Sequence, residues 1–225
     1  MPLKDDAEIE ITALSWVPAP AQGVVKDLRI RWALEEAGLD YRVRLLPLER
    51  PPEYVKEQPF NQVPCFDDGK VQIFESGAIL QYLGEQSEIL LPRDPLGKFR
   101  AIQWTFSAVS SVEPFIQFRA LLNGPFAALE WAEPAKPTFD HYARLRLGQI
   151  ADRLGDNQWL EGDRFTIGDL MMVSVLRIAD RSGQLADLPT LAALVKRGEA
   201  RPAFQQALSD QLAAFRENQP EGVAA

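Results

Sequence analysis

The feature that most constrains the fold of this 225-residue chain is a change in hydrophobic periodicity near residues 84–97. Before that point, patterns with the two-residue period of strands alternate with helical patterns, and after it every apolar pattern is helical. The segment EQSEILLPRDP at 85–95 contains two prolines, which is typical of a linker. We therefore predict an α+β domain over 7–86 and an all-α domain over 96–218.

The first half is predicted to form a small mixed sheet with helices on its faces. Alternating side chains over 8–14 and 41–46 predict two strands, and an amphipathic pattern over 24–37 predicts a helix between them. A strand–helix–strand unit of this kind pairs its strands in parallel. In 65–74, a DG turn signal between two apolar arms predicts an antiparallel hairpin, and a helical pattern follows Ser76.

The second half is predicted to contain only helices, over 96–122, 138–154, 166–181, 188–198 and 202–216. Thr166 precedes one of these patterns and Asp169 follows three residues later, which is the spacing of a reciprocal capping box. We expect this pair to hold the end of a core helix in place and to take no part in substrate binding.

Composition and charge exclude several classes of function. With 24 Lys and Arg against 32 Asp and Glu, the net charge of −8 argues against a nucleic-acid binder. A single cysteine excludes an internal disulfide, and a single histidine leaves few further ligands, so no metal site is expected. No signal peptide and no membrane-spanning apolar run is present, so a cytoplasmic protein is expected. The protein must use few ionisable catalytic groups or borrow a reactive group from a ligand.

Five segments resemble the cytosolic glutathione transferases in their order and spacing: RIRWALEEAGLDY, PFNQVPCF, IFESGAILQYL, WLEGDRFTIGDLMM and LPTLAALVKRGEARPAF. The resemblance covers nearly the whole chain. It implies an N-terminal thioredoxin-like domain, a C-terminal all-α domain and a homodimer. It also implies glutathione as co-substrate, with no other cofactor, and a hydrophobic small molecule as the second substrate.

Two motifs correspond to the glutathione-binding residues of that family. The resemblance implies a cis bond between Val63 and Pro64, which leaves the peptide groups of Val63 open to pair with glutathione as an added strand. Ser76 opens a helix and could bind the γ-glutamyl carboxylate, while Glu75 could pair with the adjacent ammonium. From the residues alone, Pro64 could instead be a trans proline, Ser76 a plain N-cap and Glu75 a solvated charge.

The side chain that activates the glutathione thiol in the family is missing. The family's usual Ser or Cys aligns near Val24 and Lys26, and its usual Tyr falls within 16–20, where no hydroxyl or thiol stands. Four substitutes remain: Ser15, the Trp16 indole, the Gln22 amide and the helix N-terminus near Val24. We favour the backbone amides near Val24, with Lys26 adding positive charge. Cys65 is expected to be a buried, inert thiol.

The acceptor substrate is expected to bind against the helix over 96–122, where Trp104 and Phe115 could line an apolar pocket. At helical spacing such aromatic side chains could equally belong to the core. The leading function is conjugation of the glutathione thiol to hydrophobic electrophiles. The alternatives are reduction of disulfides or peroxides with glutathione, a non-catalytic protein that binds glutathione or an apolar ligand, and an interaction module without ligand.

Overall fold

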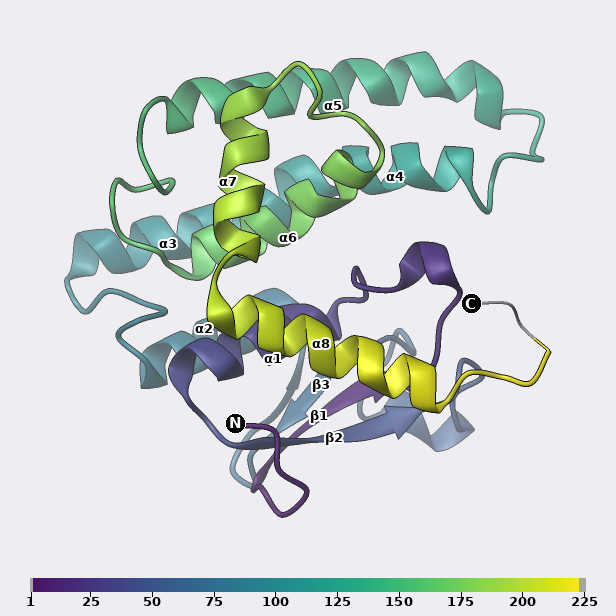
Figure 1. Cartoon of the computed structure of the whole chain (residues 1–225), viewed down its shortest axis with the longest axis vertical. Helices are drawn as coiled ribbons and strands as arrows, with labels where there is room; N and C mark the ends of the chain where they lie inside the picture. Colours follow the sequence, from purple (N-terminus) through teal and green to yellow (C-terminus); the bar gives the residue numbers. More distant parts are fainter. Residues whose placement is uncertain (1, 223–225) are drawn as a thin grey trace. The chain divides into compact units, whose positions relative to one another are not determined.

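The computed structural model describes residues 2–222 and divides into two compact units, which are coloured by sequence in Figure 1. The first unit holds the chain up to residue 90 together with the segment from residue 200 onward, and the second holds residues 91–199. The change from a mixed α/β pattern to a helical one therefore coincides with a boundary between compact units.

The first unit contains the small mixed sheet that the alternating patterns predict, and its four strands lie in the order β2-β1-β3-β4. The strands are β1 (Ile9–Leu14), β2 (Tyr41–Leu46), β3 (Cys65–Asp67) and β4 (Gln72–Phe74), and the helices between and after them are α1 (Asp27–Ala37) and α2 (Ser76–Gln86). β1 and β2 pair in parallel, with Ile11 opposite Val43, whereas β3 is antiparallel to both of its neighbours. This is the thioredoxin-like arrangement that the resemblance implies for the first half.

The last helix, α8 (Pro202–Glu217), belongs to the first unit and not to the helical domain over 96–218 in which we expected it. Its Phe204 ring packs edge-to-face on Trp32 of α1 at 4.9 Å, and both side chains are buried. Beside α8, Arg201 forms an ion pair with Glu36 at 2.5 Å. Hydrophobic periodicity shows that a segment is an amphipathic helix but not which surface its apolar face covers, so the expected boundary differs from the observed one.

A buried polar cluster ties α8 to the beginning of α1. Asp27 is 1% exposed and forms an ion pair with Arg31 at 2.8 Å. Gln211 of α8 donates from Nε2 to Asp27 Oδ1 at 2.8 Å. Burial raises the pKa of the Asp27 carboxyl, while Arg31 and Gln211 act in the opposite direction. The cluster joins two segments 184 residues apart in the chain.

The second unit is helical: α3 (Pro95–Ser107), a π-helical turn (Ala108–Val112), α4 (Glu113–Asn123), α5 (Ala132–Leu154), α6 (Ile167–Arg181) and α7 (Pro189–Glu199). The helix predicted over 96–122 is interrupted because Pro114 cannot donate to the preceding turn and its ring clashes there. α5 begins six residues earlier than the predicted 138. Pro134 lies in its first turn, where no backbone donor is needed.

The capping box at the start of α6 is confirmed. The Thr166 hydroxyl accepts a hydrogen bond from the Gly168 N–H at 3.2 Å, and the Asp169 carboxylate accepts one from the Thr166 N–H at 2.9 Å. Asp169 also accepts from the Leu160 N–H at 2.8 Å, so it fastens the preceding loop to the helix. Within residues 2–222, no helix combines the length and apolar character needed to cross a membrane.

Candidate functional site

The peptide bond between Val63 and Pro64 is cis, as predicted, and it borders a small pocket in the first unit. The pocket is lined by Lys26, Gln58, Gln62, Val63, Pro64, Glu75 and Ser76. Five of these seven residues are predicted site residues, and they come from three separate segments of the chain. The fold therefore brings together the cis-proline loop, the beginning of α2 and the residue that precedes α1.

Glu75 and Ser76 stand at the N-terminus of α2. Glu75 has φ 71° and ψ 115°, a conformation that is costly for a residue with a side chain and that occurs most often at functional sites. Its side chain is exposed and makes no capping hydrogen bond. Ser76 is the first helical residue, as predicted, and is 5% exposed. The plain N-cap alternative for Ser76 is excluded because Glu75 holds the cap position.

Arg29 of α1 supplies positive charge behind Ser76. Its guanidinium Nη1 donates to the Ser76 hydroxyl at 3.2 Å, and the Arg29 side chain is only 3% exposed. Helix N-termini also carry partial positive charge from unpaired backbone N–H groups. The beginning of α2 is thus well suited to an anion. The periodicity of α1 did not identify Arg29 as part of the site, because its neighbour lies 47 residues away in sequence.

Gln58 and Gln62 also line the pocket, although no sequence motif predicted them. Gln58 is 3% exposed, and its Oε1 accepts hydrogen bonds from the N–H groups of Phe60 at 2.6 Å and Gln62 at 3.2 Å. These contacts fold the loop that leads into the cis-proline bond. Their position in QPFNQVP, next to the glutathione motif, is the one local signal that could have indicated them.

The structure changes the expected site of thiol activation. α1 begins at Asp27 and not at 24, because residues 23–26 form turns and Gly23 adopts a positive φ of 73°. The Val24 N–H donates to the Ala21 carbonyl at 3.2 Å, so it is not a helix N-terminal amide. The Gln22 amide donates to the carbonyl of Val17 at 3.1 Å. Neither residue is among those that line the pocket.

Of the predicted activators, Lys26 is the one that lines the pocket. It holds the N-cap position of α1, where its backbone is still helical. Trp16 is partly buried and packs against an apolar cluster that consists of Leu14, Val17, Leu46, Tyr54, Val63, Cys65 and Phe215. Lys26 therefore places a cation in the same pocket as Glu75 and Ser76, while Trp16 supports the core beside it.

Cys65 is the buried thiol that we expected. It is 3% exposed, and burial raises the pKa of its thiol. A protonated, enclosed thiol is a poor nucleophile. The Tyr54 hydroxyl lies 3.5 Å from its sulfur. Among the residues described, no cluster of three His, Cys, Asp or Glu side chains could hold a metal ion.

Trp104 and Phe115 both contact other side chains of the helical unit. The Trp104 indole N–H donates to Glu161 at 2.7 Å, and a Cβ at Gly168 would lie only 2.7 Å from the Trp104 Cβ. Phe115 stacks on Tyr142 with ring centroids 5.2 Å apart. Neither residue lines the pocket beside the cis peptide bond. Their part in acceptor binding stays a prediction.

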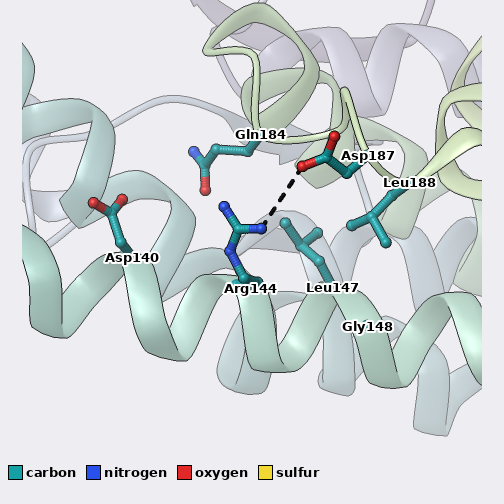
Figure 2. A pocket seen from close by; sticks show the side chains of 7 residues that line it. All are labelled: Asp140, Arg144, Leu147, Gly148, Gln184, Asp187 and Leu188. Carbon is teal, nitrogen blue, oxygen red and sulfur yellow. Dashed lines mark ion pairs between the residues drawn. The ribbon is translucent and has the colours of Figure 1, made fainter.

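A second pocket lies within the helical unit, between α5 and the segment that leads into α7 (Figure 2). It is lined by Asp140, Arg144, Leu147, Gly148, Gln184, Asp187 and Leu188. Figure 2 shows Arg144 and Asp187 facing each other across it, with a long ion-pair distance of 3.8 Å. Both side chains are more than four-fifths exposed, and the lining contains no nucleophile. This pocket is therefore a weaker candidate for a functional site than the pocket beside the cis peptide bond.

Comparisons with known proteins show which family this chain resembles. A model of the glutathione S-transferase N-terminal domain matches residues 23–85, and a model of the C-terminal domain matches residues 128–202. Glutathione S-transferase GstA of Escherichia coli O157:H7 is 30% identical over 188 residues, which cover 78% of this chain and 89% of that protein. Disulfide-bond oxidoreductase YfcG of Escherichia coli (strain K12) is 29% identical over 80% of this chain and 88% of that protein.

Solved structures show the same fold. A glutathione transferase family member from Pseudomonas fluorescens pf-5, crystallised with two glutathione bound, has a TM-score of 0.78 and 25% sequence identity. The match covers 89% of this chain and 92% of that one. Because the match covers most of both chains, the two proteins share the fold as well as the short motifs.

Proposed function

Because this chain belongs to the glutathione S-transferase family, we propose that it binds glutathione at Val63-Pro64 and conjugates the glutathione thiol to hydrophobic electrophiles. The observation that carries the proposal is the single pocket in which the cis peptide, Glu75, Ser76 and Lys26 meet. In the reaction, the glutathione sulfur forms a bond to carbon while the leaving group departs, and the thiol proton is released.

Glutathione binding follows from the chemistry of the pocket. The backbone of the tripeptide pairs with the peptide groups of Val63 in the manner of an added strand. Its γ-glutamyl carboxylate binds at the N-terminus of α2, where the Ser76 hydroxyl stands and the buried Arg29 adds positive charge. The exposed Glu75 carboxylate accepts hydrogen bonds from the neighbouring ammonium. One end of the ligand is thereby recognised through both of its charges.

Lys26 is the residue that we propose to stabilise the thiolate. Residues 22–26 read QGVVK and contain no hydroxyl or thiol, and the Val24 amide is already engaged in a turn. An ammonium group near a thiol lowers the thiol pKa because it favours the charged form. A cation of this kind stabilises the anion without taking the proton, which leaves to solvent.

A second reaction, reduction of disulfides by glutathione, is favoured by the same absence of a hydroxyl. The relative YfcG is named a disulfide-bond oxidoreductase. Two glutathione molecules would reduce one disulfide to two thiols and form one glutathione disulfide, so electrons balance without any cysteine of the protein. This role is consistent with the buried state of Cys65. A protein that binds glutathione without turnover is the remaining alternative.

We further propose that the chain works as a homodimer in the cytoplasm, where glutathione is kept reduced. An exposed apolar stripe on α3 supports association. Leu96, Phe99 and Phe106 are 62%, 66% and 58% exposed and lie on one side of that helix. Exposed apolar side chains that gather on one face mark interaction surfaces. Light scattering after size exclusion tests the proposal, and a monomeric mass would contradict it.

The activity is tested by three measurements on the wild-type protein and on Lys26→Met. Calorimetry measures glutathione binding, ultraviolet absorbance of the thiolate measures the pKa of the bound thiol, and turnover is measured with an aryl halide and with a small disulfide. Lys26→Met should raise the bound thiol pKa, whereas Lys56→Met, an exposed lysine outside the pocket, should not. A wild-type protein that binds glutathione with the thiol pKa of free glutathione would refute the role of Lys26.

A further inference from the structure

A buried chain of hydrogen bonds connects the two ends of the segment that carries the cis peptide. The Tyr54 hydroxyl donates to the Gln62 carbonyl at 2.8 Å, directly before Val63. The same hydroxyl lies 2.7 Å from Thr12 Oγ1. Thr12 Oγ1 also accepts the backbone N–H of Cys65 at 2.7 Å, directly after Pro64. One pair of side chains therefore holds both ends of Gln62–Cys65.

The directions of these hydrogen bonds follow from the groups at the two ends. A backbone N–H can only donate and a backbone carbonyl can only accept. The proton order must therefore run from the Cys65 N–H to the Thr12 hydroxyl, from that hydroxyl to Tyr54, and from Tyr54 to the Gln62 carbonyl. Hydrogen bonds arranged head to tail in this way strengthen one another. The Cys65 sulfur, 3.5 Å from Tyr54, is left with only a weak contact.

We propose that Tyr54 is a positioning residue for glutathione binding, whose hydroxyl acts with Thr12 to clamp the Val63-Pro64 peptide in its ligand-binding geometry. The inference rests on the proposed pairing of glutathione with Val63. Thr12 and Tyr54 are each 1% exposed, so water has little access to replace the lost bonds. A loop that is already held in its bound geometry loses less conformational freedom when the ligand binds.

The ring of Tyr54 and its hydroxyl have separable roles. The ring packs in the apolar cluster with Leu14, Val63 and Phe215. The guanidinium carbon of Arg44 also lies 5.9 Å from the ring centroid. Tyr54→Phe keeps these contacts and removes only the oxygen. Any change in ligand affinity can then be assigned to the clamp and not to loss of core packing.

The test compares glutathione binding by calorimetry in the wild-type protein and in Tyr54→Phe. We expect the dissociation constant for glutathione to rise about 5- to 10-fold, the contribution of one intramolecular hydrogen bond. The pKa of the bound thiol should not change, because Lys26 remains in place. The matched control is Tyr41→Phe, since Tyr41 is 0% exposed, donates to Glu35 at 3.3 Å and does not line the pocket.

A second readout, the hydrogen-exchange rate of the Cys65 amide, needs no ligand. Tyr54→Phe should accelerate this exchange by freeing the Thr12 hydroxyl that orders the Cys65 N–H, while Tyr41→Phe should leave it unchanged. Faster exchange together with weaker glutathione binding supports the clamp. Unchanged affinity in Tyr54→Phe, or an equal loss in Tyr41→Phe, overturns it. If the wild-type protein binds no glutathione, the proposed function fails. Independently of glutathione, an unchanged exchange rate of the Cys65 amide in Tyr54→Phe overturns the clamp.

Discussion

Replacing Asp169 by alanine should destabilise the protein strongly while leaving the glutathione site intact. The carboxylate is 0% exposed and accepts hydrogen bonds from the Leu160 N–H at 2.8 Å, the Thr166 N–H at 2.9 Å and the Thr166 hydroxyl at 3.0 Å. Alanine leaves two buried backbone donors without an acceptor, and each such loss costs about 1–3 kcal/mol. We expect the free energy of unfolding to fall by about 2–6 kcal/mol, and the full loss is reached only below the unfolded pKa of 3.8.

The loss should depend on pH in a direction that the structure determines. Burial raises the pKa of Asp169 from 3.8 to about 6, against the opposing effect of its hydrogen bonds. Because the folded-state pKa is the higher one, the stability that protonation contributes is complete below the unfolded pKa and is lost as pH rises through about 6. This rise in the pKa of Asp169 corresponds to about 3 kcal/mol in the free energy of unfolding. The difference between wild type and Asp169→Ala should therefore be larger at low pH than near neutrality.

Urea unfolding followed by circular dichroism at about pH 5 and about pH 7.5 measures this difference. Asp163→Ala is the matched control, since Asp163 is exposed in the same loop and should change stability little. Glutathione affinity of the folded variant should equal that of the wild type, because Asp169 belongs to the second unit and the pocket to the first. A stability difference that grows as pH rises would refute this account of the buried carboxyl.

Two further predictions concern the first unit. Ser76→Ala should raise the glutathione dissociation constant about 10-fold or more, the contribution of a hydrogen bond to a charged group, as measured by calorimetry; equal affinity would contradict carboxylate binding at α2. Phe204→Ala should lower the free energy of unfolding by about 3–5 kcal/mol in urea titrations, because it leaves a cavity against Trp32. Phe60→Ala, at a position 66% exposed, should cost far less, and equal losses would refute the structural role of α8.

Much of the fold follows from local patterns. The strand alternation of 8–14, the helical period of 24–37 and the hairpin signal in 65–74 each reflect interactions between residues close in the chain, and each produced the expected element. The capping box of Thr166 and Asp169 is equally local and is confirmed. The start of α1 was predicted three residues too early, because Gly23 and the turns after it interrupt an apolar pattern that periodicity alone continues.

The candidate site was predicted in part. The motifs identified Val63, Pro64, Glu75 and Ser76, and the missing hydroxyl directed attention to Lys26, which does line the pocket. Arg29 and Gln58 were not identified, because their part in the site depends on buried hydrogen bonds that only the fold creates, and no local sequence pattern marks them.

The sequence by itself determined the order of the main helices and strands, the change from a mixed to a helical pattern and the family motifs, because these depend on short-range periodicity and on residue types at fixed spacing. Only the tertiary structure decided that α8 packs on α1, that Tyr54 and Thr12 hold the cis-proline segment, and that Arg29 lies behind Ser76. The physical reason is distance along the chain. A hydrogen bond between residues 42 or 184 positions apart exists only once the fold has brought them together and excluded water from the space around them.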